Sequence, residues 1–404
     1  MHKWKYSVDG RMAQVRLRNG ADLAALKELD NKAWLALSCP VSGVRFDLRT
    51  LELLDTDKDG RIRTPEVIAA IDFLLAKGVD LDTLFKKDEA DERALADLVA
   101  KAVAAPDEER LLRYKLHLVE FLENFVNMRR LYDENEAMFQ TGVLRMDSRE
   151  MNLCFHVEAE EAHSALVAKS KCCVLYVKLV RPSEGLERMI CAVVTAGKVG
   201  GLYAGRNGVF YDRDGKDWEA TVTNVVEAQV SLVEAFWSPW RKIGEGIAGA
   251  VQKFLGDRQS ATAAAVAESA EKAATGAKET GGATTASGVA AIGIGVGMVT
   301  AAFASLMAAI SHMTTLQLVG SAAAVVLLVS LPSVILTWFK LRSRDLGAIL
   351  NASGWAVNRP LYFSMRRARA FTRCASDPFL RRLVSLTLLF IVSVIAAVIY
   401  FNPY

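Results

Sequence analysis

The spacing of apolar residues changes along the chain. They recur every three or four positions from Ala21 to about Tyr132, and from about Phe139 the spacing becomes two. A period of three to four indicates helices, and a period of two indicates strands with one buried face. The first twenty residues alternate as a short strand pair around Asp9 and Gly10. The pattern therefore predicts a helical module over residues 1–135 and an antiparallel β-rich domain over 139–226.

After the β-rich part the chain becomes amphipathic and then poor in large side chains. Residues 227–258 are expected to form an amphipathic helix with Trp237, Trp240 and Ile247 on its apolar face. Such a helix lies in a membrane interface or packs under the β-rich domain, and the sequence favours neither. Residues 259–287 are rich in alanine, threonine and glycine, which predicts a linker without a core of its own.

A membrane region is predicted over residues 288–404, which contain three long apolar runs at 288–310, 316–339 and 383–401. At a rise of ~1.5 Å per residue, about 20 residues cross the ~30 Å hydrocarbon core of a bilayer. The second and third runs are therefore predicted to be transmembrane helices. The first run has fewer large side chains, so the sequence leaves open whether it inserts into the membrane.

Charge sets the expected orientation. The loop at 340–382 contains ten basic and two acidic residues, and short loops this basic stay in the cytoplasm. The N-terminus lacks an apolar signal segment. These features predict a multi-pass membrane protein with cytoplasmic N-terminal domains. The lipid bilayer is one expected partner, and the basic loop is expected to attract anionic lipids.

The first apolar run also has a small residue at every fourth position, at Gly293, Gly297, Ala301 and Ser305. Small residues at this spacing let two helices approach closely, so a homo-oligomer is one expectation. The alternative is that alanine and glycine are simply abundant in this run.

The stretch DTDKDGRIRTPE, from Asp55 to Glu66, has the pattern of a calcium-binding loop. Twelve-residue calcium loops place oxygen ligands at positions 1, 3, 5, 7 and 12 and glycine at position 6. The predicted metal ligands are Asp55, Asp57, Asp59, the backbone carbonyl of Arg61, and Glu66, with Gly60 at the turn. Position 9 departs from the pattern, because the side chain of Arg63 cannot be a ligand and water would have to replace it.

Helical periodicity before and after this loop gives the order helix, loop, helix. The loop resembles those of the EF-hand superfamily. More widely, the chain is similar to a family of bacterial EF-hand-containing membrane proteins without an assigned activity. The stretches that carry this resemblance are WLALSCPVSGVRFDLRTLELLDTDKDGRIRTPEV, GRNGVFYDRDGKDWEATV, AFWSPWRKI and LGAILNASGWAVNR. The resemblance implies a bacterial inner-membrane protein and no particular reaction. The predicted fold class is α+β, with an N-terminal helical EF-hand module, an antiparallel β-rich domain and C-terminal transmembrane helices.

The ion expected in this loop is Ca²⁺, with an affinity from about micromolar to millimolar, because Arg61 and Arg63 offset part of the carboxylate charge. Mg²⁺ is a possible occupant. The simpler alternative is an acidic surface turn without an ion.

Composition adds little further chemistry. The chain is 52% apolar with a net charge of +3, and its six cysteines lack metal-ligand spacing. No catalytic motif is found, so no enzyme is predicted. The basic residues cluster beside apolar runs, which does not suggest nucleic-acid binding. The stretch HVEAEEAH places His156, Glu160 and His163 close together, either as a second metal site or, as the pattern favours, as a solvated charged turn.

Two functions from different classes follow from these patterns. The first is a calcium-responsive sensor or regulator on the cytoplasmic face of a bacterial inner membrane. The second is a structural membrane scaffold or oligomer, in which a permanently bound ion stabilises two helices. An enzyme with its site in the β-rich domain is a third class, for which the sequence offers no residues.

Overall fold

The computed structural model describes residues 2–9, 12–86, 88–101, 106–249, 252 and 314–375. Contacts divide the chain into two compact units, Met1–Glu234 with Leu336–Ala375, and Ala235–Ile335 with Ser376–Tyr404. The first unit therefore contains the acidic loop, the β-rich part and most of the segment predicted to be a basic loop. The fold and site below are those of this first unit unless stated otherwise.

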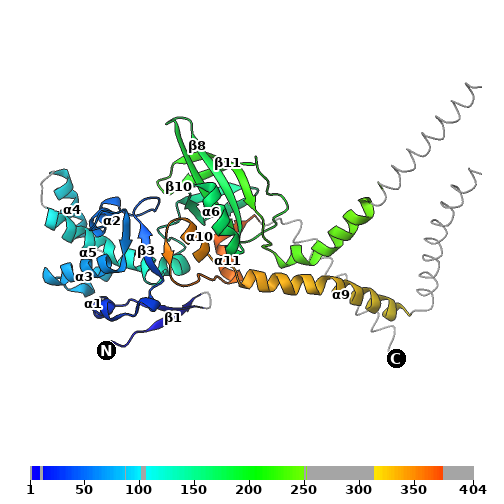
Figure 1. Ribbon diagram of the computed structural model, residues 1–404, viewed down its shortest axis with the longest axis horizontal. Coiled ribbons are helices and arrows are strands. Elements are labelled where there is room, and N and C mark those ends of the chain that lie inside the picture. The colour runs from blue at the N-terminus through cyan, green and yellow to red at the C-terminus, as the bar shows by residue number, and fades with distance from the viewer. Residues whose placement is uncertain are drawn as a thin grey trace, which may run out of the picture. The chain divides into compact units, whose positions relative to one another are not determined.

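The N-terminal region combines helices with short strands (Figure 1). Its strands are β1 (Tyr6–Asp9), β2 (Met12–Val15), β3 (Ala36–Pro40) and β4 (Arg61–Arg63). Its main helices are α1 (Gly20–Ala24), α2 (Leu48–Leu54), α3 (Thr64–Ala76), α4 (Glu89–Ala100) and α5 (Pro106–Phe125). Short helical turns are η1 (Ala25–Glu28), η2 (Asn31–Ala33), η3 (Leu81–Phe85) and η4 (Arg130–Glu134). β1 and β2 pair antiparallel, as the alternation predicted.

An eight-stranded antiparallel sheet follows, in the order β13-β6-β5-β10-β11-β8-β9-β7. Its strands are β5 (Gly142–Met146), β6 (Arg149–Met151), β7 (Cys154–His156), β8 (Cys173–Arg181), β9 (Leu186–Val194), β10 (Asn207–Asp212), β11 (Asp217–Val226) and β13 (Thr372–Cys374). The helical elements α6 (Glu160–Val167) and η5 (Ala168–Ser170) lie between β7 and β8. In β11, Trp218, Ala220 and Val222 are buried and alternate with exposed residues. This is the period of two that the sequence showed.

The segment after the second apolar run folds with the N-terminal parts. It forms α10 (Gly347–Ala352), β12 (Ala356–Val357), α11 (Met365–Phe371) and β13. Arg344 is almost fully buried here: its Nη1 donates to the Thr195 carbonyl at 2.8 Å, and its guanidinium lies 4.5 Å from the centre of the Phe363 ring. Residues 344–375 are thus a folded part of the first unit.

The predicted fold class is wrong and is corrected here. The described residues form a mixed α/β fold, and the N-terminal region is not a helical EF-hand module, because β3 and β4 form a three-stranded sheet with β12. One hydrophobic core contains Phe121 of α5, Phe155 and Tyr176 of the large sheet, and Trp355 and Phe363 of the C-terminal segment. β3 is the central strand, with β4 on one side and β12, which comes from the far end of the chain, on the other, so local spacing did not reveal this sheet.

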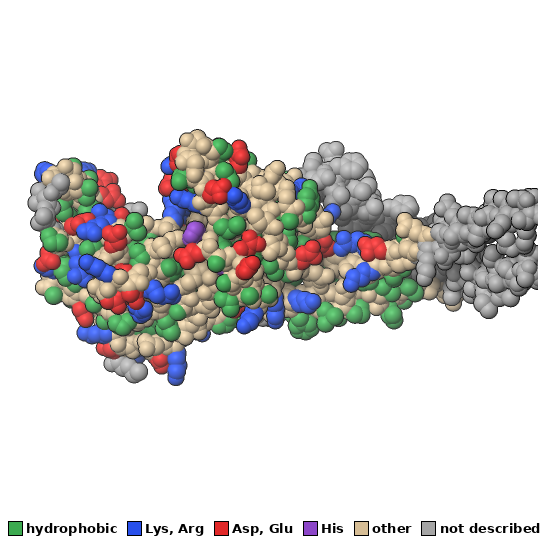
Figure 2. All heavy atoms as spheres, turned by 45° about the horizontal axis from the view of Figure 1, so that its top comes forward, with side chains coloured by type: hydrophobic (Ala, Val, Ile, Leu, Met, Phe, Trp, Pro, Cys, Tyr) green, Lys and Arg blue, Asp and Glu red, His purple; other side chains and the backbone are tan. Residues whose placement is uncertain are grey.

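The prediction of several C-terminal transmembrane helices is also not supported. Among the described residues, one helix, α9 (Thr315–Arg342), is long and apolar enough to cross a membrane, over Ala323–Arg342. It corresponds to the predicted run 316–339, and only 17% of its apolar window is buried. Figure 2 shows apolar side chains along this helix, whereas charges of both signs are mixed over the N-terminal region. The runs 288–310 and 383–401, the linker 259–287 and the small residues Gly293 to Ser305 lie outside the described residues.

A helix is present over residues 232–249, within the segment 227–258 that was predicted to form an amphipathic helix. Trp237 and Ile247 on it are more than half exposed. Trp240 instead forms a hydrogen bond, in which its Nε1 donates to Ser330 Oγ of α9 at 2.8 Å.

Candidate metal centre

A helix lies on each side of the acidic loop. The N-terminus of α2 is capped by Asp47, whose Oδ2 accepts from the backbone N–H of Thr50 at 2.8 Å. α2 ends at Leu54, directly before Asp55. α3 begins at Thr64 with Pro65 in its first turn, where the absence of an N–H costs no helical hydrogen bond.

Backbone N–H groups hold the three aspartates in place. The two carboxylate oxygens of Asp55 accept from Asp59 N–H at 3.1 Å and from Gly60 N–H at 2.8 Å. Asp57 Oδ1 accepts from Asp59 N–H at 3.2 Å, and Asp59 Oδ1 accepts from Arg61 N–H at 2.9 Å. Gly60 has a φ of +82°, in a region that glycine adopts without strain. The loop therefore wraps its carboxylates around one point.

The spacing of the aspartates fits one ion. One oxygen from each of Asp55, Asp57 and Asp59 lies within 4.8 Å of the others, with Asp55 buried and the other two exposed. Two oxygens bound to the same Ca²⁺ at about 2.3–2.6 Å lie at most about 5 Å apart. Three of the four predicted carboxylates are thus brought together, in a set of oxygen donors that suits a hard cation.

Glu66 lies beside this group without belonging to it. Its Oε1 accepts from the backbone N–H of Thr56 at 2.8 Å and from Thr56 Oγ1 at 3.1 Å, and its Oε2 accepts from Arg63 N–H at 2.8 Å. The side chain is 9% exposed. Glu66 therefore ties the first half of the loop to the start of α3. Binding an ion with both of its oxygens requires the carboxylate to turn toward the aspartates.

The two arginines of the loop have different roles. Arg61 donates from Nε to Ser38 Oγ at 3.2 Å and from Nη2 to the Gly354 carbonyl, so only its backbone carbonyl is left for an ion. Arg63 lies against the aspartates, with Nη2 at 2.6 Å from Asp59 Oδ2 and Nη1 at 3.7 Å from Asp57 Oδ2. A cation in the loop therefore competes with this guanidinium. The sequence missed that role, although the i, i+4 spacing of Asp59 and Arg63 is a signal for it.

The electrostatics of the loop follow from these contacts. The hydrogen bond from Arg63 lowers the pKa of Asp59, and the same contact raises the pKa of Arg63. The pKa of Asp57 is raised: the Asp59 N–H favours its ionised form, but desolvation and the negative charges of Asp59 and Glu66 outweigh that bond. A bound cation would therefore assist the ionisation of Asp57.

A strand supports the back of the loop. Ile62, at position 8, is fully buried and pairs with Cys39 of β3, and β3 pairs on its other side with β12. The Gly60 carbonyl also accepts from Val41 N–H at 3.0 Å. β3 therefore provides hydrogen-bond partners for the backbone of β4. No feature of the loop sequence indicated this partner.

No family model, curated protein or solved structure matches the chain. The resemblance to the EF-hand superfamily therefore remains a hypothesis that rests on the loop residues themselves.

The alternative metal site around His156, Glu160 and His163 does not form. His163 is buried, with Nδ1 at 2.8 Å from Tyr176 Oη and Nε2 at 3.0 Å from Ser353 Oγ, and burial lowers its pKa to about 4. Glu160 instead accepts from Thr223 Oγ1 at 3.0 Å. Within the described part of the chain, the aspartates of the loop are the group found with metal-ligand spacing. His163 is a buried structural histidine and not part of a solvated turn.

Proposed function

We propose that this chain is a membrane-attached calcium-binding protein whose loop Asp55–Glu66 responds to the ion. The observation that supports this most is the convergence of Asp55, Asp57 and Asp59 on one point. Ca²⁺ suits this loop better than Mg²⁺, because it accepts six to eight oxygens in flexible geometry, whereas Mg²⁺ requires a small octahedral site and retains its water.

Attachment to a membrane is supported by α9. The helix has a mean hydropathy of 2.0 over its apolar window, and Leu328 and Leu336 are mostly exposed. Its C-terminal end carries Trp338 and Arg342, with the guanidinium 5.1 Å from the centre of an indole ring. Aromatic and basic residues at the end of an apolar helix are typical of membrane interfaces. The cytoplasmic face of a bacterial inner membrane, and contact of the basic residues with anionic lipids, extend this proposal from the sequence pattern and the resemblance.

The regulatory role is supported by a path from the loop to the segment that follows α9. β4 belongs to the loop and lies in one sheet with β3 and β12, and Arg61 donates to the carbonyl of Gly354 just before β12. Ion binding that displaces Arg63 and turns Glu66 would shift β4. Because β12 is in the same sheet, the change would reach residues 352–357.

The scaffold alternative also has a supporting observation. Without an ion, the hydrogen bonds to Asp55 and Glu66 already close the loop. A loop that is closed in advance would change little on binding, and the ion would then only add stability.

Hydrogen–deuterium exchange of the 404-residue chain in mild detergent separates the two functions. A regulator predicts that Ca²⁺, compared with EGTA in constant Mg²⁺, alters exchange in the loop and in residues 352–357, and that Asp55→Asn abolishes both changes. A scaffold predicts protection confined to the loop. Exchange that is unchanged by Ca²⁺ throughout would contradict both.

A further inference from the structure

A cavity of about 430 Å³ lies in the first unit, apart from the acidic loop. Its walls come from the segment 43–46 before α2 and from strands of the large sheet. Phe46, Leu179, Ile190, Phe210 and Trp218 give it an apolar lining. A cavity of this size is large enough for a small organic molecule.

Three arginines line this cavity, the exposed Arg45 and Arg188 and the partly buried Arg213. They come from three places in the sequence: the segment before α2, strand β9, and the turn between β10 and β11. Arg188 lies over the Trp218 ring at 4.8 Å from its centre. Within the described ranges, none of the three has a carboxylate at ion-pairing distance, whereas most other arginines of the N-terminal region do.

Arg213 is the most enclosed of the three. Desolvation lowers its pKa and the positive charges of Arg45 and Arg130 lower it further, while the negative charge of Glu136 raises it. An arginine is costly to bury beside like charge unless an anion accompanies it. The arrangement therefore favours a negatively charged ligand.

Among the described residues, the acidic groups that line the same cavity form no ion pair with the three arginines. Asp212 is committed to its own hairpin: Oδ1 accepts from Asp214 N–H at 3.0 Å and from Lys216 N–H at 2.8 Å, and Oδ2 accepts from Trp218 Nε1 at 3.1 Å. Asp214 is exposed at the turn. His156 has a lowered pKa because of burial and is neutral near neutral pH.

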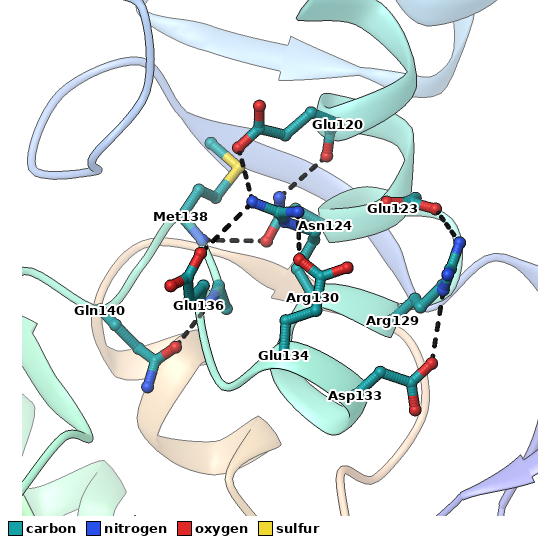
Figure 3. Close-up of polar contacts among 11 residues, drawn as sticks. Glu120, Glu123, Asn124, Arg129, Arg130, Asp133, Glu134, Glu136, Met138 and Gln140 are labelled. Atoms are coloured by element: carbon teal, nitrogen blue, oxygen red, sulfur yellow. Dashed lines mark hydrogen bonds and ion pairs between the residues drawn. The ribbon is translucent and has the colours of Figure 1, made fainter. Parts of the chain in front are cut away.

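The wall that carries Arg45 is held in place by the surrounding fold. The backbone N–H of Arg45 donates to the Met138 carbonyl at 2.6 Å, and the N–H of Met138 donates to Asn124 Oδ1 at 2.9 Å. Figure 3 shows this Asn124–Met138 contact beside Arg130, which lies among Glu120, Glu134 and Glu136. Arg130 therefore has carboxylate partners of its own, whereas Arg45, which lines the cavity, forms no ion pair among the described residues.

We propose that this cavity binds a small organic phosphate, with the phosphate between Arg45, Arg188 and Arg213 and an apolar or aromatic body against Phe210 and Trp218. Guanidinium groups bind phosphate oxygens through two parallel N–H donors, which gives both strength and orientation. The apolar lining distinguishes such a ligand from inorganic phosphate. The site is separate from the acidic loop, so it does not depend on calcium binding.

Calorimetric titration of the 404-residue chain with phenyl phosphate, in mild detergent and EGTA, tests the proposal. We expect one site per chain, binding that is at least about fivefold weaker for inorganic phosphate, and no binding of phenol. Equal affinity for phenyl phosphate and inorganic phosphate, or no binding up to about 10 mM, would overturn the proposal.

Variants locate the site. Arg213→Gln and, at the more exposed rim, Arg188→Gln should each weaken binding by about tenfold or more, because each removes a charged donor pair. Arg93→Gln, on an exposed arginine of α4, is the matched control and should leave binding unchanged. If Arg213→Gln does not fold, the effect of Arg188→Gln on phenyl phosphate binding still tests the site. An equal loss of affinity in Arg93→Gln and Arg188→Gln would show that binding depends on the net charge of the protein and not on this cavity, and would overturn the site.

The phosphate has two possible sources, a free metabolite or a lipid headgroup. A short-chain phosphatidic acid titrated in the same way separates them. Tighter binding of the phosphatidic acid would identify a lipid headgroup as the ligand, and tighter binding of phenyl phosphate would identify a free organic phosphate. Either result supports the site if Arg188→Gln weakens it.

Discussion

Replacement of Glu66 by glutamine tests the two roles assigned to this residue, which are to bind the ion and to tie the ion-free loop to the start of α3. In the ion-free loop, its two oxygens accept from the N–H groups of Thr56 and Arg63, both at 2.8 Å. Glutamine keeps one acceptor and places an NH₂ group where the other oxygen was. One hydrogen bond is then lost, and the remaining one no longer has a charged acceptor.

The magnitude follows from hydrogen-bond energetics. A hydrogen bond to a charged acceptor contributes about 1.5–3 kcal/mol, so Glu66→Gln should lower the free energy of unfolding by about 2 kcal/mol without calcium. For a chain of this size, this corresponds to a fall of roughly 2–3 °C in Tm. At a calcium concentration of about 100 times Kd, the wild type gains about 2.7 kcal/mol, which a variant without the bidentate ligand largely forgoes. The difference between the two proteins should therefore roughly double.

Thermal unfolding in EGTA and in Ca²⁺ measures both effects. Glu89→Gln, which removes an exposed glutamate from the first turn of α4, is the matched control and should shift Tm by less than about 1 °C in either condition. An equal wild-type-to-variant difference in EGTA and in Ca²⁺ would refute Glu66 as a ligand. No difference in EGTA would refute its capping role.

Three further predictions concern the loop and its surroundings. Arg63→Gln should tighten calcium binding by roughly three- to tenfold in calorimetry, because the guanidinium no longer competes at Asp57 and Asp59; weaker binding would contradict the competition. Calcium affinity should fall as the pH is lowered toward the raised pKa of Asp57, and in Arg63→Gln this fall should begin at higher pH, because the pKa of Asp59 is no longer depressed. Because the pKa of buried His163 lies near 4, below its unfolded value of 6.5, stability should be complete above pH 6.5 and decline as the pH falls toward 4; His163→Gln should flatten this decline in denaturant titrations, and an unchanged profile would contradict the burial argument.

The parts of the structure that depend on neighbouring residues could be predicted from the sequence. The turn at Gly60, the capping of α2 and the alternation in β11 are set within a few positions, so spacing and residue type suffice. The convergence of Asp55, Asp57 and Asp59 follows from the loop in the same way. Whether they bind an ion is a question of energy that the spacing does not answer.

The remaining features depend on contacts between distant parts of the chain. Arg344 looked like one of many basic loop residues, yet it is buried against the Thr195 carbonyl and Phe363. β12 has two residues, too few for a periodic signal, and pairs with β3. His163 appeared to belong to a charged turn because its partners Tyr176 and Ser353 lie far away in the sequence. In each case the residue type indicated exposure, and tertiary contacts determined burial.

The most direct test of the central claim is calorimetric titration of the 404-residue chain with Ca²⁺ in millimolar Mg²⁺, alongside Asp55→Asn. Asp55 accepts two backbone N–H groups and contributes one of the three converging oxygens. The account predicts one calcium site per chain, with affinity in the range of about micromolar to millimolar, that is lost in Asp55→Asn. Absence of binding, or binding of equal affinity in Asp55→Asn, would contradict it.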